Sequence, residues 1–170
     1  MIYRFRVILD ATEDIFRDIE IQEDATFEDF NNAITQAFGF DGMEMASFYV
    51  SDDEWNQGEE ISQFDMSEGQ DSVRLMNETT LDGVLSEDQT RLIYVYDFLN
   101  MWTFLVELAE IAAPINGQSY PNLLFSHGIL PDSAPEKNFE ADEDPYGFND
   151  NEDDLDINDY DSLNFDENWN

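Results

Sequence analysis

Residues 3–21, YRFRVILDATEDIFRDIEI, decide the fold of this chain. Apolar and polar residues alternate in YRFRVIL, which places Tyr3, Phe5, Val7 and Leu9 on one face of an extended segment. The polar turn DATED follows, and IFRDIEI then predicts a returning strand. We therefore expect an N-terminal β-hairpin that buries one of its two faces.

Three arginines take different positions in this hairpin. The short turn sets a register in which Arg6 lies opposite Asp18. Arg4 then lies opposite Glu20, and each such cross-strand pair contributes about 0.2–1 kcal/mol. Arg17 instead points toward the buried face, where a guanidinium needs a carboxylate or several carbonyl oxygens. We predict that Arg17 is a buried structural charge paired with a carboxylate.

Residues 26–40, TFEDFNNAITQAFGF, predict an amphipathic helix. Thr26 suits the N-cap, acidic residues follow in the first turn, and Gly39 suits the exit from the helix. Apolar residues recur at helical spacing, namely Phe27, Phe30, Ala33, Ile34, Ala37 and Phe38. A hairpin followed by a helix that covers it resembles the start of a β-grasp unit, so the fold class that we expect is α+β with a mixed β-sheet.

Further strands are predicted after the helix. MASFYV is one, RLIYVYDF and WTFLVELAEI form a second hairpin, and YPNLLFSHG is a short edge strand. Tyr94, Tyr96 and Phe98 occupy alternating positions of the second hairpin.

Two irregular segments lie between these predicted strands. Residues 51–71 predict a long acidic loop anchored by Trp55, Ile61 and Phe64. Farther on, NETTLDGVLSED predicts a short helical turn, whose inward residues are Leu81, Val84 and Leu85.

The charge of the chain limits the partners that it can bind. It carries 41 acidic and 6 basic residues, a formal net charge of −35. Charge of this size repels nucleic acid phosphates and anionic membranes, so we expect neither as a direct ligand and a basic protein as the partner. Cysteine is absent, and neither a signal peptide nor an apolar stretch of about 18 residues is present, which favours a cytoplasmic protein.

The composition divides the chain into two parts. Residues 1–135 have the apolar patterns of a globular α+β domain, whereas residues 136–170 hold 14 acidic residues and one lysine. Such a segment is typical of a flexible, largely disordered tail. Tyr160, Phe165 and Trp169 stand among its carboxylates, and we predict that they anchor a basic partner. The alternative is that they fold back onto an apolar groove of the same domain.

Motifs for catalysis or cofactor binding are not found in the sequence. Its one histidine, His127, stands among apolar residues at a predicted strand end, and no G-x-S-x-G motif accompanies it. Neither a phosphate-binding glycine loop nor an HExxH motif is present. Carboxylate pairs are so frequent that none marks an acid-base site. We therefore predict no catalytic residue, no metal site and no cofactor.

The segment YVYDFLNMW, together with the N-terminal strands, the helix and ASFYV, resembles the plasmid Ri ORF-3-like family, also described as insertion-element passenger or TnpR-family proteins. The resemblance covers about residues 1–136 and is closest to an acidic-tailed, Bacteroides-type branch. The family signature YxYDFGDxWxH is matched by Tyr94, Tyr96, Asp97, Phe98 and Trp102. Leu99 and Asn100 replace its Gly and Asp, and Phe104 replaces its His.

That resemblance implies an α+β fold and a mobile-element context, without an established activity. We predict a non-enzymatic, acidic protein-interaction module in which Asp97, Asn100 and Trp102 contact the partner together with the tail. One alternative is a DNA mimic that inhibits a basic DNA-binding protein. Another is a Mg²⁺-dependent enzyme that uses carboxylates near Asp52, Asp53 and Asp97.

Overall fold

The computed structural model describes residues 1–64 and 74–135. The chain divides into two units, Met1–Ala134 and Pro135–Asn170. The first contains every described strand and helix. The predicted tail, with Tyr160, Phe165 and Trp169, lies outside the described residues.

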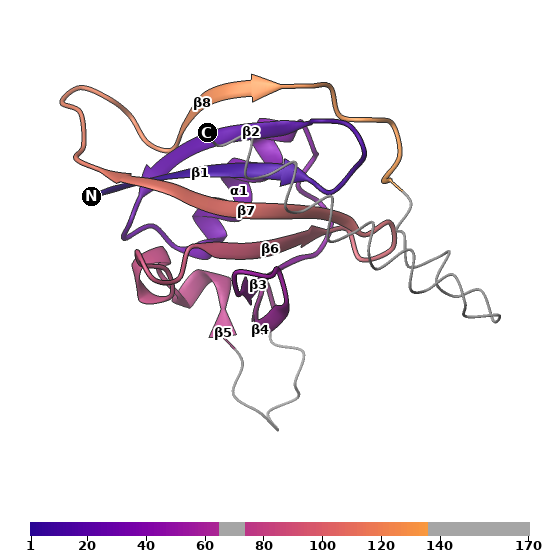
Figure 1. Ribbon diagram of the computed structural model, residues 1–170, viewed down its shortest axis with the longest axis horizontal. Coiled ribbons are helices and arrows are strands. Elements are labelled where there is room, and N and C mark those ends of the chain that lie inside the picture. The colour runs from indigo at the N-terminus through magenta and orange to yellow at the C-terminus, as the bar shows by residue number, and fades with distance from the viewer. Residues whose placement is uncertain (65–73, 136–170) are drawn as a thin grey trace. The chain divides into compact units, whose positions relative to one another are not determined.

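One mixed β-sheet of eight strands organises the described part of the chain, in the order β5-β4-β3-β6-β7-β1-β2-β8 (Figure 1). Only β4 and β5 pair in parallel, and every other neighbouring pair is antiparallel. The predicted α+β class with a mixed sheet is confirmed. The strands are β1 Ile2–Leu9, β2 Phe16–Gln22, β3 Ala46–Ser51, β4 Gln57–Ser62, β5 Arg74–Leu75, β6 Arg91–Tyr96, β7 Trp102–Ala112 and β8 Asn122–His127.

The N-terminal hairpin has the predicted register. Arg4 lies opposite Glu20 and its Nε atom is 3.1 Å from a carboxylate oxygen of that residue. Arg6 lies opposite Asp18 and makes two hydrogen bonds to its carboxylate, of 2.8 and 3.0 Å. The predicted cross-strand ion pairs of both arginines are therefore confirmed.

The helix α1, Phe27–Phe38, lies on one face of the sheet, behind β1, β7 and β6 in Figure 1. Thr26 caps it, since its hydroxyl accepts from the Asp29 amide while the Asp29 carboxylate accepts from the Thr26 amide. Gly39 ends the helix in the left-handed conformation, with φ 85°. The predicted N-cap and exit are confirmed.

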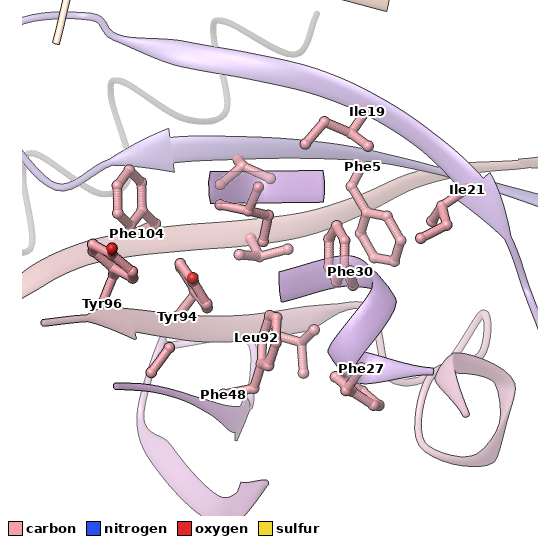
Figure 2. Packing of buried hydrophobic residues seen from close by; sticks show 14 of the residues in the cluster. Phe5, Ile19, Ile21, Phe27, Phe30, Phe48, Leu92, Tyr94, Tyr96 and Phe104 are labelled. Carbon is pink, nitrogen blue, oxygen red and sulfur yellow. The ribbon is translucent and has the colours of Figure 1, made fainter. Parts of the chain in front are cut away.

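Aromatic rings pack against one another between α1 and the sheet (Figure 2). The Phe30 ring of α1 lies 4.3 Å from that of Phe5 on β1 and 5.5 Å from that of Phe48 on β3. All three side chains are fully buried. The helix thereby joins the two halves of the sheet across their shared face.

One buried polar pair interrupts this apolar core. The Tyr94 hydroxyl on β6 donates a hydrogen bond to the Asn31 side-chain oxygen on α1. Both residues are buried. Burial, together with the nearby Tyr96, raises the pKa of Tyr94 well above its usual value of 10.0.

The raised pKa of Tyr94 predicts a loss of stability in alkali. Below about pH 10 the phenol is neutral in both the folded and the unfolded chain, so its contribution to stability is complete. Above that pH only the unfolded chain ionises, and the free energy of unfolding falls by up to about 1.4 kcal/mol per pH unit. Urea denaturation at several pH values from about 9 to 11 should show a shallower decline for Tyr94→Phe than for wild type. If the free energy of unfolding declines equally with pH in both proteins, ionisation of Tyr94 does not contribute to the loss of stability.

The structure corrects two predictions about the loops. Residues 51–71 do not form a single acidic loop, because β4 lies within them and pairs with both β3 and β5. Ile61 is fully buried as predicted, whereas Phe64 is exposed and does not belong to the buried core. Phe98 is also exposed, since β6 ends at Tyr96 and the chain turns there.

Other predictions for the second half of the chain are confirmed. The β6–β7 hairpin forms, and β8 is the edge strand next to β2. A short 3₁₀ turn, Leu81–Gly83, carries Leu81 into the core, and Leu85 is buried behind it. Within the described part of the chain, no helix has the length and apolar character needed to cross a bilayer.

Candidate functional site

A cleft of about 740 Å³ opens at the end of the sheet where β6 ends and β7 begins. We call it the acidic–aromatic cleft. Its lining comes from β2, the end of α1 and the loop after it, the β6–β7 turn, and the segment after β8. The lining residues are Arg17, Phe38, Gly39, Phe40, Asp41, Glu44, Tyr96, Asp97, Trp102, Gly128, Ile129, Leu130, Pro131 and Asp132.

Aromatic rings form one wall of the cleft. Phe40 stacks on Tyr96 with ring centroids 4.4 Å apart, and it meets Trp102 edge to face at 5.2 Å. Tyr96 and Trp102 are mostly buried, while Phe40 is partly exposed. The electron-rich faces of such rings attract cations.

Carboxylates stand around the aromatic wall. Asp41, Glu44 and Asp132 are exposed residues of the cleft lining. Asp41 accepts hydrogen bonds from the Met43 amide, at 2.9 Å, and from the Tyr96 hydroxyl, at 3.0 Å. These two bonds hold the pKa of Asp41 below its usual value, so this carboxylate stays ionised. The cleft therefore presents negative charge beside its aromatic rings.

Asp97 lines the cleft, but its carboxylate is occupied within its own turn. One oxygen accepts from the amides of Leu99 and Asn100, and the other accepts from the Asn100 side chain at 2.6 Å. Asp97 and Met101 both have positive φ, 65° and 58°, and the Met101 amide bonds back to the Asp97 carbonyl. Asp97 and Asn100 thus shape the β6–β7 turn, and Trp102 is the one of the three predicted contact residues that forms the aromatic wall.

Arg17 is buried as the hairpin register implies, with 8% of its surface exposed. Its partners differ from the predicted carboxylate, because Nε donates to the Ala37 carbonyl while Nη1 donates to the carbonyls of Phe16 and His127. The guanidinium also lies over the Phe38 ring, 4.8 Å from its centroid. No ion pair of Arg17 occurs within residues 1–64 and 74–135.

These carbonyl partners have a physical explanation. Ala37 belongs to the last turn of α1, where carbonyl groups lack partners inside the helix and carry partial negative charge. Arg17 supplies a cation there, and α1 has no basic residue of its own in that turn. Burial lowers the pKa of Arg17, yet an arginine stays charged in a protein.

Gly128 brings the segment after β8 into the cleft. It has φ 84°, and a Cβ atom at this position would lie 2.8 Å from the Asp14 carbonyl oxygen and 2.9 Å from the Ile15 side chain. Only glycine fits this approach without displacing its neighbours. The close packing carries the chain from β8 toward Asp132, at the rim of the cleft.

The acidic residues proposed for a Mg²⁺ site are not brought together. Asp97 follows β6 beside Met45, whereas Asp52 and Asp53 follow the opposite end of β3, where Ser51 pairs with Arg91. The Asp52 carboxylate accepts from Glu54 and Asn56 instead. Across the described ranges, no group of three potential ligands is placed to hold a metal ion.

His127, the histidine weighed for catalysis, ends β8 and stacks on Phe16 with centroids 5.2 Å apart. The structure gives this imidazole a packing role at the sheet edge.

The sequence analysis singled out Arg17, Asp97 and Trp102 but missed the other residues of the cleft lining. Phe40 and Asp41 follow the helix exit, and Asp132 follows the last strand, so they lie far apart in the chain. No local pattern links these segments, because they meet only through the pairing order of the strands in the sheet.

The family model described as Plasmid pRiA4b ORF-3-like protein matches residues 1–167. The chain belongs to this family. The ORF-3-like chain is also similar in fold to a protein of unknown function from Methanosarcina mazei Go1, with a TM-score of 0.65 and 18% sequence identity. That match covers 91% of the ORF-3-like chain and 88% of the archaeal one. No curated protein is detectably similar in sequence.

Proposed function

We propose that this member of the ORF-3-like family is a non-enzymatic, acidic binding module for a basic protein, and that the acidic–aromatic cleft receives a lysine or arginine side chain of that partner. The observation that supports the proposal most directly is the placement of Phe40, Tyr96 and Trp102 beside Asp41, Glu44 and Asp132. Aromatic faces and carboxylates both favour a cation.

Two further features support a cationic ligand. The formal net charge of −35 attracts a basic partner over a long range and accelerates its association. The volume of the cleft, about 740 Å³, falls within the range of about 300–1,000 Å³ that is usual for binding sites in proteins. The cleft is therefore large enough for a lysine or arginine side chain together with part of the backbone of that residue.

Neutralising the rim of the cleft should weaken the binding of a cationic peptide. The probe is acetyl-Gly-Gly-Lys-Gly-Gly-amide, and the variant is Glu44→Gln with Asp132→Asn. We expect at least a fivefold increase in Kd, measured by following the Trp102 indole resonance in NMR titrations at a fixed salt concentration. Both carboxylates are exposed on the surface, so the stability of the fold should change little.

The matched control is Glu87→Gln with Asp88→Asn, which removes two exposed acidic residues near the start of β6, at the opposite end of that strand from the cleft. It should leave Kd within about twofold of wild type. Equal weakening by both variants would show that the peptide responds to total charge, and the cleft proposal would then be abandoned.

The proposal also includes the C-terminal tail and a role of the protein in a mobile element. Tyr160, Phe165 and Trp169 would add contacts to the same basic partner, with their acidic neighbours favouring a cationic surface. A role in a mobile element is supported by the plasmid origin that the description of the family records. Loss of partner binding when Phe165 and Trp169 become alanine, at unchanged net charge, would test the tail separately.

A further inference from the structure

One nitrogen of the Arg17 guanidinium has no acceptor within the part of the chain that the structure describes. Nε and Nη1 together donate to three carbonyl oxygens, and these are the hydrogen bonds of the Arg17 side chain in that part. Nη2 carries two further N–H donors. Arg17 is more than nine-tenths buried and is one of the residues that line the acidic–aromatic cleft.

The charge of Arg17 is also incompletely compensated. Its three hydrogen-bond partners are neutral carbonyls, and the end of α1 and the face of the Phe38 ring offer only partial negative charge. A buried cation without a carboxylate in contact is costly, and native proteins usually pair it. Donors left free on a buried cation in a cleft therefore indicate a missing anionic acceptor.

A simple anion would meet repulsion from the carboxylates at the rim. Asp41, Glu44 and Asp132 are exposed, so solvent and salt weaken that repulsion, whereas the buried guanidinium is weakly screened. A ligand that carries its own cation would satisfy both parts of the cleft at once.

We infer that the acidic–aromatic cleft binds a carboxylate together with a side-chain cation, the carboxylate at Nη2 of Arg17 and the cation at the acidic rim. This chemistry is shared by a free basic amino acid and by the C-terminal lysine or arginine of a protein. The inference rests on the proposed function, to which it adds the second anchor and the end of the chain that enters the cleft.

The test compares three blocked peptides on the wild-type chain. They are acetyl-Gly-Gly-Lys with a free carboxylate, the same peptide as its C-terminal amide, and acetyl-Gly-Gly-norleucine with a free carboxylate. We expect the first to bind at least tenfold more tightly than each of the other two in NMR titrations. General attraction to a protein of charge −35 would instead favour the amide, which is more positive.

Arg17→Met should remove the preference for the carboxylate while the amide peptide binds as it does to wild type. If that variant does not fold, the peptide series on wild type still decides, because it changes only the ligand. A titration with free lysine then distinguishes a free amino acid from the C-terminal residue of a protein as the ligand. Affinity similar to that of the peptide indicates a free amino acid, and weaker affinity indicates a C-terminal residue, while both results support the shared chemistry.

Two results would overturn the inference. If the amide binds as tightly as the free carboxylate or more tightly, Arg17 does not receive an anion, although the proposed cation site stands. If none of the lysine peptides binds, both the inference and the proposed function fail.

Discussion

Replacing Phe30 with alanine should lower the free energy of unfolding by about 3–5 kcal/mol. Phe30 is fully buried and its ring contacts those of Phe5 and Phe48, so the truncation removes apolar burial and leaves a cavity between α1 and the sheet. Urea denaturation followed by circular dichroism measures the change.

Leu99→Ala is the matched control, because Leu99 is a large apolar residue with 92% of its surface exposed. Its unfolding free energy should stay within about 0.5 kcal/mol of wild type. A cost for Phe30→Ala of about 1 kcal/mol or less would mean that α1 is not packed against the sheet as described.

Replacing Gly128 with valine should cost about 2–5 kcal/mol and weaken binding in the acidic–aromatic cleft. A non-glycine residue at φ 84° is strained by about 1–2 kcal/mol. The added side chain would also begin 2.8 Å from the Asp14 carbonyl oxygen, and overpacking of this kind costs about 1–3 kcal/mol more. Thermal and urea denaturation measure the stability, and NMR titration with the lysine peptide measures the affinity of the cleft.

The control Gly117→Val distinguishes the cost of backbone strain from the cost of steric overlap. Gly117 has the same φ of 84°, but a Cβ atom there would have no neighbour within 4 Å. This control should show the backbone strain alone and leave the cleft unchanged. Equal costs at both glycines would show that the contact with Asp14 does not constrain the segment after β8.

Local patterns were sufficient to predict the elements whose burial is periodic. The hairpin register followed from alternation in YRFRVIL, and the helix followed from Thr26, Gly39 and an apolar stripe. The strand β4 was missed because four of its six residues are exposed, three of them polar and one a glycine, so QGEEIS lacks the alternation of a half-buried strand. Its place next to β3 comes from tertiary pairing.

The candidate site was less predictable for a related reason. Asp97 looked like a contact residue because it lies in a distinctive motif, but its carboxylate closes the turn that Asn100 completes. The hydrogen-bond partners of Arg17 are backbone oxygens from α1, β2 and β8. A pattern of side chains in the sequence does not predict contacts with backbone atoms of distant elements. Charge composition predicts a cationic ligand, and the cleft that we propose for it could be recognised only in the fold.

The interior position of β1 in the sheet has a consequence for how the chain folds. β1 pairs with β2, which follows it directly, and also with β7, about a hundred residues later in the sequence. On a ribosome the first hairpin and α1 emerge long before β7 can cover the open edge of β1. Such non-local pairing slows folding and leaves a strand edge unprotected during synthesis. The like charges of this acidic chain would then keep neighbouring nascent chains apart until the sheet closes.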